Sequence, residues 1–149
     1  MNTGKKVAIV TGGGSGLGFA IAEKFIAGGI TTIIAGRDKE KLTKAKEQLG
    51  NLCYAIPCDV SNLSSIPAFV EWVLKQFGQI DILVNNAGIN LKKEFTEVTD
   101  EEFHNILTTN VTAVFSMSRE VVKHMLPRGT GNIINISSMA AQYGLPKVI

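Results

Sequence analysis

The sequence predicts an α/β fold with a doubly wound parallel sheet, and three observations support this prediction. Short β-branched apolar runs of strand length alternate with longer segments of helical spacing along the 149 residues. A glycine-rich turn joins the first strand to the first helix, and small or polar residues follow the fourth and fifth strands. Such alternation produces right-handed crossovers and a parallel sheet with helices on both faces. We expect one domain, residues 1–149, with the strand order 3-2-1-4-5.

The first strand and the turn after it are the most informative stretch. Lys6–Val10 is a β-branched apolar run, and Thr11–Gly18 contains five glycines before a segment of helical spacing. Glycines let the main chain approach a pyrophosphate, and the following helix offers free N–H groups to the anion. No lysine followed by Ser or Thr comes after Gly18, so the nucleoside-triphosphate loop pattern is absent. The stretch predicts a dinucleotide site; the alternative is a turn that only joins strand to helix.

The end of the second strand, Ile30–Ala35, is where a dinucleotide fold places the group that reads the adenosine ribose. Gly36, Arg37 and Asp38 follow this strand. A carboxylate would accept a bond from a free 2′-hydroxyl, whereas a guanidinium fits a 2′-phosphate and Gly36 leaves room for one. The pattern favours NADP(H), with NAD(H) as the other possibility. In the alternative interpretation Asp38 caps the next helix and Arg37 is a solvated charge.

Polar and small residues also follow the third and fourth strands, which we expect over 52–58 and 78–84. Asp59 and Val60 come after the third strand, and Asn85–Gly88 after the fourth. Small residues let the backbone pass close to a cofactor, and amide side chains can bond neighbouring strand ends. Asp59 or Ser61 could equally cap the helix that follows, which we expect to run to Phe77.

These motifs together resemble the N-terminal part of the short-chain dehydrogenase/reductase family. The turn reads Thr-Gly-x-x-x-Gly-x-Gly, and Asn-Asn-Ala-Gly follows the fourth strand. The resemblance implies a Rossmann-like sheet and NADP(H)-linked hydride transfer. Residues 88–93 and 137–141 are similar to sugar-acid dehydrogenases such as gluconate 5-dehydrogenase, although 3-oxoacyl-carrier-protein reductases share nearly all of this pattern. The implied cofactor contacts are Gly12, Gly14, Ser15, Gly16, Leu17, Gly18, Arg37, Asp59, Val60, Asn86, Ala87 and Gly88.

The resemblance also assigns two catalytic positions. Asn110 lies in a long helix expected over 99–126, which begins with a Thr-Asp-Glu-Glu capping box. It matches the family's active-site asparagine, which holds an ordered water in a proton relay. Ser138, at the end of a strand expected over 132–138, matches the family's catalytic serine. From the residues alone, Asn110 could bond backbone within a core of Ile106, Val111 and neighbouring apolar residues, and Ser138 could be an ordinary strand-end serine.

The chain departs from the family's pattern at its C-terminal end. The family's reaction uses a tyrosine and a lysine four residues later, normally a dozen or more residues beyond the serine. The sequence ends at Ile149, eleven residues after Ser138. Tyr143 and Lys147 match the spacing, but the glycine and proline between them oppose a shared helix face. We therefore expect a fold truncated after the fifth strand.

Two functions follow from these observations. The first is an NADP-dependent oxidoreductase that moves hydride between nicotinamide and a carbonyl or secondary alcohol, with a sugar acid or a 3-oxoacyl compound as substrate. The second is a catalytically inactive dinucleotide-binding fragment or module. In either case truncation would expose the edge of the fifth strand and an apolar flank of the long helix, which favours a homo-oligomer.

Composition excludes other classes of partner. The 15 basic and 13 acidic residues are interspersed and give a net charge of +2, so neither nucleic acid nor an anionic membrane is expected. No apolar run has membrane-spanning length and no signal-peptide cleavage region is present, which indicates a cytoplasmic protein. Cys53 and Cys58 would point to opposite faces of one strand, and His104 and His124 have no ligand partner at repeated spacing. We expect no disulfide and no metal site.

Overall fold

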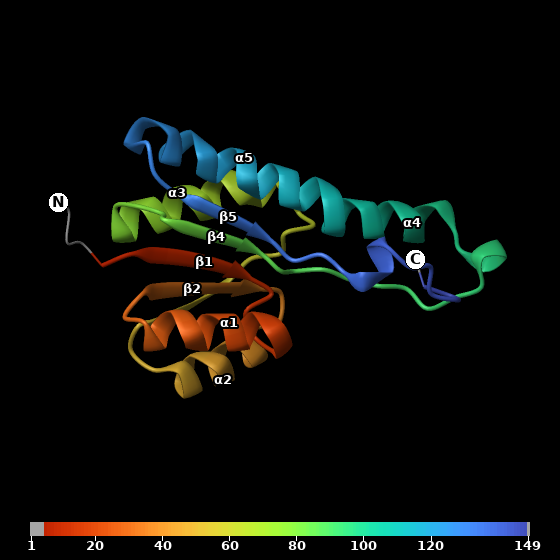
Figure 1. Cartoon of the computed structure of the whole chain (residues 1–149), viewed down its shortest axis with the longest axis horizontal. Coiled ribbons are helices and arrows are strands. Elements are labelled where there is room, and N and C mark those ends of the chain that lie inside the picture. Colours follow the sequence, from red (N-terminus) through yellow and green to blue (C-terminus); the bar gives the residue numbers. More distant parts are fainter. Residues whose placement is uncertain (1–4, 149) are drawn as a thin grey trace.

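A five-stranded parallel sheet forms the centre of the computed structural model, which describes residues 5–148 (Figure 1). The strand order β3-β2-β1-β4-β5 confirms the predicted order. The strands are β1 (Val7–Thr11), β2 (Thr31–Gly36), β3 (Cys53–Pro57), β4 (Ile82–Asn85) and β5 (Asn132–Asn135). The principal helices are α1 (Gly16–Ala27), α2 (Lys39–Leu49), α3 (Ile66–Phe77), α4 (Asp100–Leu107) and α5 (Ala113–Met125).

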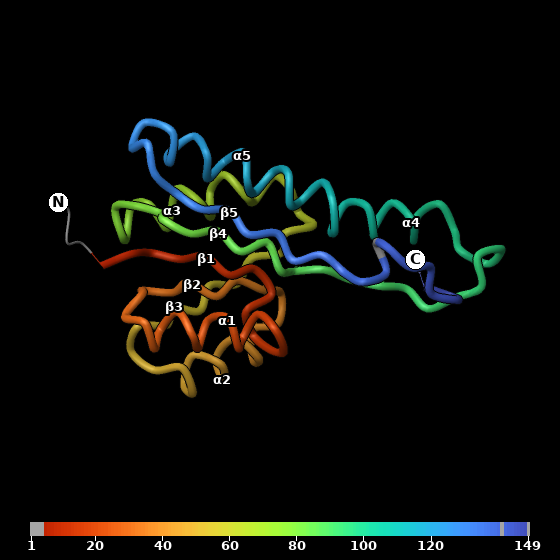
Figure 2. The backbone as a smooth tube through the Cα atoms, viewed as in Figure 1, coloured from red at the N-terminus to blue at the C-terminus, as the bar shows by residue number. Residues whose placement is uncertain are grey.

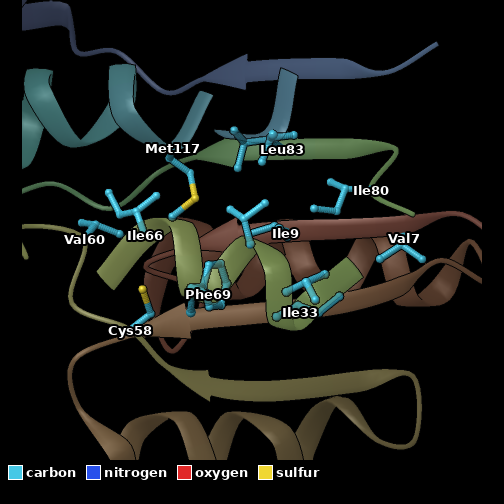
Figure 3. Close-up of a cluster of buried hydrophobic side chains, with 14 of the residues drawn as sticks. Val7, Ile9, Ile33, Cys58, Val60, Ile66, Phe69, Ile80, Leu83 and Met117 are labelled. Carbon is cyan, nitrogen blue, oxygen red and sulfur yellow. The ribbon is translucent and has the colours of Figure 1, made fainter. Parts of the chain in front are cut away.

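Helices cover both faces of the sheet: α1 and α2 lie on one side, and α3 and α5 on the other (Figure 1). Successive residues of a strand point to opposite faces, so Ala8 and Val10 join the core beneath α1 and α2. Ile9 joins the core beneath α3 and α5, where it packs with residues such as Leu83 and Met117 (Figure 3). Burial on both faces explains why the parallel strands read as continuous apolar runs.

The two cysteines also lie on opposite sides, as predicted. Cys53 belongs to the core beneath α1 and α2, and Cys58 to the core beneath α3 and α5. Both thiols are buried and free. Burial raises the pKa of Cys53 to about 11, and it raises the pKa of Cys58 as well, so both remain protonated thiols near neutral pH.

The fifth strand is shorter than the sequence predicts. β5 pairs with β4 from Ile82 opposite Asn132 to Asn85 opposite Asn135, so it ends where its partner ends. Ser138 therefore lies beyond the strand, at the start of a short 3₁₀ turn. All four residues of β5 are exposed, which confirms the predicted open sheet edge.

The predicted long helix is interrupted. The capping box is present: Thr99 Oγ1 accepts from the N–H of Glu102, whose carboxylate accepts from the N–H of Thr99. A π-helical turn over Thr108–Thr112 then separates α4 from α5. A π turn holds more residues than an α turn, which changes the direction of the following side chains. Val111 is 58% exposed, so the expectation of an apolar core around Asn110 is wrong.

Two segments extend beyond the carboxyl ends of the strands, side by side (Figure 2). The loop after β4 meets the C-terminal segment in an antiparallel bridge between Lys92 and Val148. The N–H of Lys93 donates to the carbonyl of Lys147 at 3.0 Å. Across residues 5–148, none of the helices has both the length and the apolarity that a membrane span requires.

Candidate functional site

A cavity of about 250 Å³ lies beyond the carboxyl ends of β1 to β4. In open α/β sheets, ligands bind in a crevice at this edge. Of the twelve expected cofactor contacts, eight line the cavity: Gly12, Ser15, Arg37, Asp59, Val60, Asn86, Ala87 and Gly88. The structure thus brings together residues from four separate loops. The remaining four lie outside the lining: Gly14 in the glycine turn, and Gly16, Leu17 and Gly18 in the first turn of α1.

Close packing explains two of the glycines in the turn. A Cβ on Gly18 would lie 2.5 Å from Asn86 Nδ2 and would also clash with the carbonyl oxygen of Gly12. Gly12 itself has a φ of +66°, which L side chains rarely adopt. These contacts bring the first turn of α1 directly against the turn that lines the cavity.

The N-terminus of α1 is suited to an anion. Its N-cap, Ser15, makes no side-chain capping bond, and its first turn contains no acidic residue. The first N–H groups of a helix have no partner within the helix, and the helix dipole favours negative charge there. Leu17, in this first turn, is 58% exposed. It lines an apolar groove together with Ile134 and does not line the cavity.

A network of hydrogen bonds joins the glycine turn to the segment after β4. Thr11 Oγ1 donates to the carbonyl of Val84 at 3.2 Å and accepts from the N–H groups of Asn86 and Ala87, each at 3.0 Å. Asn86 Nδ2 donates back to the carbonyls of Thr11 and Gly12, at 2.9 and 3.3 Å. All the bonding capacity of the hydroxyl is used. We did not select Thr11 as a site residue from the sequence, although a hydroxyl on the last strand residue before the turn was a usable signal.

At the end of β2, Arg37 and Asp38 have different surroundings. Arg37 lines the cavity, whereas Asp38 caps α2 by accepting from the N–H of Lys41 at 3.0 Å. That backbone bond lowers the pKa of Asp38, so the carboxylate is charged at neutral pH. Asp38 therefore caps α2, as the alternative interpretation expected. Arg37, in contrast, lines the cavity and is not simply a solvated charge.

Asp59 stabilises its own loop. Its Oδ1 accepts from the N–H of Ser61 at 3.0 Å and from the Ser61 hydroxyl at 2.7 Å. The helix that follows begins only at Ile66, so the expectation that Asp59 could cap it is wrong. The turn leaves Asp59 and the buried Val60 in the lining of the cavity.

Asn110 lies in the π turn and bonds the segment after β4. Its Nδ2 donates to the carbonyl of Ile89 at 2.7 Å, and its Oδ1 accepts from the N–H of Ile89 at 2.9 Å. A Cβ on Gly88 would lie 3.3 Å from Asn110 Oδ1, so the glycine leaves room for this amide. Ile89 lines the cavity, and π turns are frequent at functional sites. Asn110 therefore holds one wall of the cavity.

Ser138 is placed differently. Its hydroxyl accepts from the N–H of Ala140 at 3.1 Å and caps the 3₁₀ turn after β5. Within residues 5–148, the cavity lining does not include this serine. The cavity lining therefore gathers eight of the expected cofactor contacts but neither of the two expected catalytic residues, although Asn110 bonds Ile89 of the lining.

Asn85 connects β4 to α5 and to β5, and sequence reasoning missed it. The buried amide donates from Nδ2 to Asn135 Oδ1 in β5 at 2.8 Å and to Ser118 Oγ in α5 at 3.0 Å. Buried amides that bond on two sides fix the elements they join. Its position in Asn-Asn-Ala-Gly was the available signal.

Tyr143 and Lys147 do not share a helix face. The segment from 142 to 148 is not helical, and Lys147 has a φ of +60°. The Lys147 ammonium pairs with Glu94 of the neighbouring loop, while Tyr143 is 64% exposed. The expectation that Tyr143 and Lys147 do not share a helix face is confirmed, and the expectation that they are not the family's tyrosine–lysine pair stays a prediction.

The comparisons with known proteins agree with this geometry. Residues 6–149 match the family model of the short chain dehydrogenases, and the chain belongs to this family. A 3α-hydroxysteroid dehydrogenase of Mediterraneibacter gnavus is 41% identical over 146 residues, which are 95% of this chain and 58% of that protein. The 5-keto-D-gluconate 5-reductase of Escherichia coli K12 is 38% identical over 95% of this chain and 56% of that protein.

A solved structure shows the same fold. Actinorhodin polyketide ketoreductase with NADPH superimposes with a TM-score of 0.92 at 35% identity, covering 96% of this chain and 57% of that chain. The chain thus spans little more than half the length of the relatives it matches. Members of the family are oxidoreductases that bind a nicotinamide dinucleotide and act on small molecules.

Proposed function

We propose that this chain binds NADP(H) in the cavity and forms the cofactor-binding part of an oxidoreductase. The observation that supports this most strongly is the convergence of eight expected contacts on one cavity at the carboxyl edge of the sheet. The glycine turn and the first N–H groups of α1 would hold the pyrophosphate, because these N–H groups have no partner within the helix and the first turn contains no acidic residue. Arg37 would bind the 2′-phosphate, and Asp59 with Val60 would contact the adenine.

Titration with the two cofactors tests this proposal. NADPH and NADH are added separately to the chain, and binding is followed by calorimetry and by the fluorescence of Trp72. We expect saturable binding with NADPH preferred. Because charge-assisted hydrogen bonds contribute about 1.5–3 kcal/mol, R37Q should weaken NADPH binding roughly 10- to 100-fold and leave NADH binding nearly unchanged. Equal losses for both cofactors would contradict the role given to Arg37.

For the reaction, the bound nicotinamide would supply or accept hydride, while the protein orients the substrate and handles the proton. Asn110 would position the cavity wall through Ile89 and hold water for proton transfer, and Ser138 would bind the substrate oxygen. The proposed substrate is a sugar acid or a 3-oxoacyl compound, each with a carbonyl or secondary alcohol. The names of the steroid dehydrogenase, the ketogluconate reductase and the polyketide ketoreductase fit this class of chemistry.

The second candidate function is a dinucleotide-binding module without activity of its own. It is favoured by the placement of Tyr143 and Lys147, which share no helix face. Loss of a proton-transfer residue typically reduces a rate by about 10²- to 10⁴-fold. NADPH oxidation with 5-keto-D-gluconate separates the candidates: binding without turnover supports the module, and turnover above the rate without protein supports the oxidoreductase.

We also propose that two copies of the chain associate through the exposed face formed by α4, the π turn and α5. An apolar stripe, defined as Phe103, Leu107, Val111 and Phe115, is exposed at 44, 39, 58 and 61%. The first turn of α4 is acidic and the last turn of α5 is basic, so an antiparallel pair related by a two-fold axis would match opposite charges.

Sedimentation equilibrium tests this association. We expect a dimer or larger assembly for the unaltered chain and a monomer for Val111→Asp. Phe95→Asp is the control, because Phe95 is 84% exposed but lies outside the stripe. A monomeric unaltered chain would contradict the proposal. The cytoplasmic location belongs to the same set of proposals, since two free buried thiols fit a reducing compartment.

A further inference from the structure

The two edges of the sheet differ in what they offer to another strand. At the β3 edge, the N–H of Cys53 already donates to the carbonyl of Gly50 at 3.1 Å, and Pro57 has no N–H. At the β5 edge, all four residues of the strand are exposed, and none is charged or a proline. Sheets in natural proteins protect their edges with charges, prolines or covering elements. β5 is therefore the edge that is open to a further strand.

The pairing of β5 with β4 fixes which backbone groups remain free. The N–H groups of Asn132 and Ile136 each donate to a carbonyl of the neighbouring β4 segment at 2.9 Å. Alternate residues of a strand direct their N–H and C=O groups to the same side. The N–H and C=O groups of Ile133 and Asn135 are therefore directed away from β4, to a side where residues 5–148 place no further strand.

The free groups of β5 match those of a second copy of β5 in one antiparallel register. In an antiparallel pair, opposed residues that exchange both hydrogen bonds alternate with opposed residues that exchange none. Ile133 of one copy would exchange both bonds with Asn135 of the other, and Asn135 with Ile133. Ile134 then lies beside the two-fold axis, opposite Ile134 of the second copy. Both copies use the same surface, so the contact is self-complementary.

Apolar side chains lie along one side of this register. Ile134 and Leu17 line the apolar groove beside α1, and Ile136 points to the same face as Ile134 because side chains alternate along the strand. Ile134, Leu17 and Ile136 are 42, 58 and 38% exposed. The grooves of two paired copies would meet at the axis and bury these residues. Between Arg128 and Lys147 the sequence contains no charged residue, so the facing strands carry no like charges that would repel each other.

We propose that β5 pairs antiparallel with β5 of a second copy and joins the two sheets across a two-fold axis at Ile134. This interface is separate from the face formed by α4, the π turn and α5, and it requires no cofactor. The contact is short, so it adds to the association through the helices. Because the β3 edges are blocked at Cys53 and Pro57, the joined sheet ends on both sides and does not grow into a stack.

Engineered cysteines test the pair and its register. Opposed residues without hydrogen bonds have Cα atoms about 4.5 Å apart, which lies within the range of roughly 4.4–6.8 Å that a disulfide spans. Under mild oxidation Ile134→Cys should therefore form a covalent dimer. Ile133→Cys is the matched control: Ile133 is exposed to a similar degree, 36% against 42%. In the proposed register, however, it is offset from its own copy by two residues, about 7 Å along the strand. We expect cross-linking to be at least about tenfold faster in Ile134→Cys.

A second set of variants tests the same register at other positions. Asn132 of one copy would oppose Ile136 of the other, so a mixture of Asn132→Cys and Ile136→Cys should form covalent dimers that contain one chain of each. Neither variant alone should do so, and nor should the unaltered chain, because Cys53 and Cys58 are buried. Val111→Asp combined with Ile134→Cys should still cross-link, since oxidation traps a short-lived pair and the helix face is separate.

Equal rates in Ile134→Cys and Ile133→Cys would overturn the inference, because random collisions and parallel stacks treat the two positions alike. If neither Ile134→Cys nor the mixture cross-linked, the edge would take another occupant, such as a strand of a different protein, and the inference would also fail. Loss of cross-linking in the combined Val111→Asp variant would overturn the separation of the two interfaces. None of these results depends on NADPH, so the proposed cofactor site and this inference can fail independently.

Discussion

Two parts of the ligand-binding edge differ in how completely this chain builds them. Around β1 and β4, the turns after the two strands are bonded to each other through Thr11 and Asn86. Around β5, the strand is exposed along its whole length, and Ser138 beyond it bonds the N–H of Ala140, two residues along the chain. The turns of the first part are bonded to each other across distant segments, whereas the Ser138 hydroxyl bonds only a neighbour in the chain.

This difference separates cofactor binding from the rest of the proposed activity. Regions with few buried contacts open at a small fraction of the global free energy of unfolding. The turns of the nucleotide part rest on both cores of the sheet, to which α3 and α5 contribute as well as α1 and α2. We therefore expect the chain to hold a dinucleotide site without assistance, whereas the region around Ser138 needs further packing before it is ordered enough for catalysis.

The largest effect is expected for Gly18→Ala, where α1 packs against the turns after β1 and β4. The added Cβ would lie 2.5 Å from Asn86 Nδ2 and would clash with the Gly12 carbonyl, so the turn must shift. We expect NADPH binding to be lost and the free energy of unfolding to fall by about 1–3 kcal/mol, the usual cost of overpacking. Calorimetric titration and urea unfolding measure the two effects. Gly144→Ala is the control, because a Cβ there meets no atom within 4 Å; unchanged binding in Gly18→Ala would contradict the description of the turn.

A smaller effect is expected for Thr11→Val. This change keeps the shape of the side chain but removes the hydroxyl that bonds Val84, Asn86 and Ala87. Buried N–H groups left without a partner cost about 1–3 kcal/mol, and the N–H groups of Asn86 and Ala87 are partly buried, so urea unfolding should show a loss toward the lower end of that range. Thr11→Ser should recover most of it.

Ser138→Ala, in the region around β5, is the counterpart of Thr11→Val because it also removes a bonded hydroxyl. That bond is exposed and local, so the free energy of unfolding should change by less than about 0.5 kcal/mol. The comparison of the two parts would fail if Ser138→Ala were as destabilising as Thr11→Val.

The smallest effect concerns the start of α4, beyond the sheet. The N–H of Thr99 holds the pKa of the Glu102 carboxyl below its usual value, and Lys93 assists. A carboxyl whose folded pKa is lowered stabilises the fold above its unfolded pKa, and this contribution is lost as the pH falls through the folded pKa. Glu102→Gln should therefore reduce the difference between urea midpoints at pH 7 and pH 3. An identical difference in the two proteins would show that the capping box contributes nothing to acid stability.

Much of the fold was predictable because its signals are local. The β-branched runs indicated the strands, and the order 3-2-1-4-5 is the one that the family resemblance implies. The end of β5 was not predictable from its own residues, because it depends on where β4 ends. The π turn at Asn110 was missed for a related reason: neither glycine nor proline marks it in the sequence.

The site was predictable where a motif requires a particular backbone, as at Gly12 and Gly18. It was less predictable where side chains from distant segments meet. Thr11 and Asn85 bond partners in other elements, at separations that no local pattern shows. The long-range bonds of these two residues became visible only once the strands were aligned.

Amide hydrogen exchange of the chain with and without NADPH most directly tests whether the cavity at the carboxyl edge is the dinucleotide site. We predict that NADPH slows exchange in residues 12–18, 36–38, 59–61 and 86–89, and leaves β5 and the segment around Ser138 unchanged. Slowed exchange confined to the groove between Leu17 and Ile134, or no slowing at saturating NADPH, would contradict this assignment.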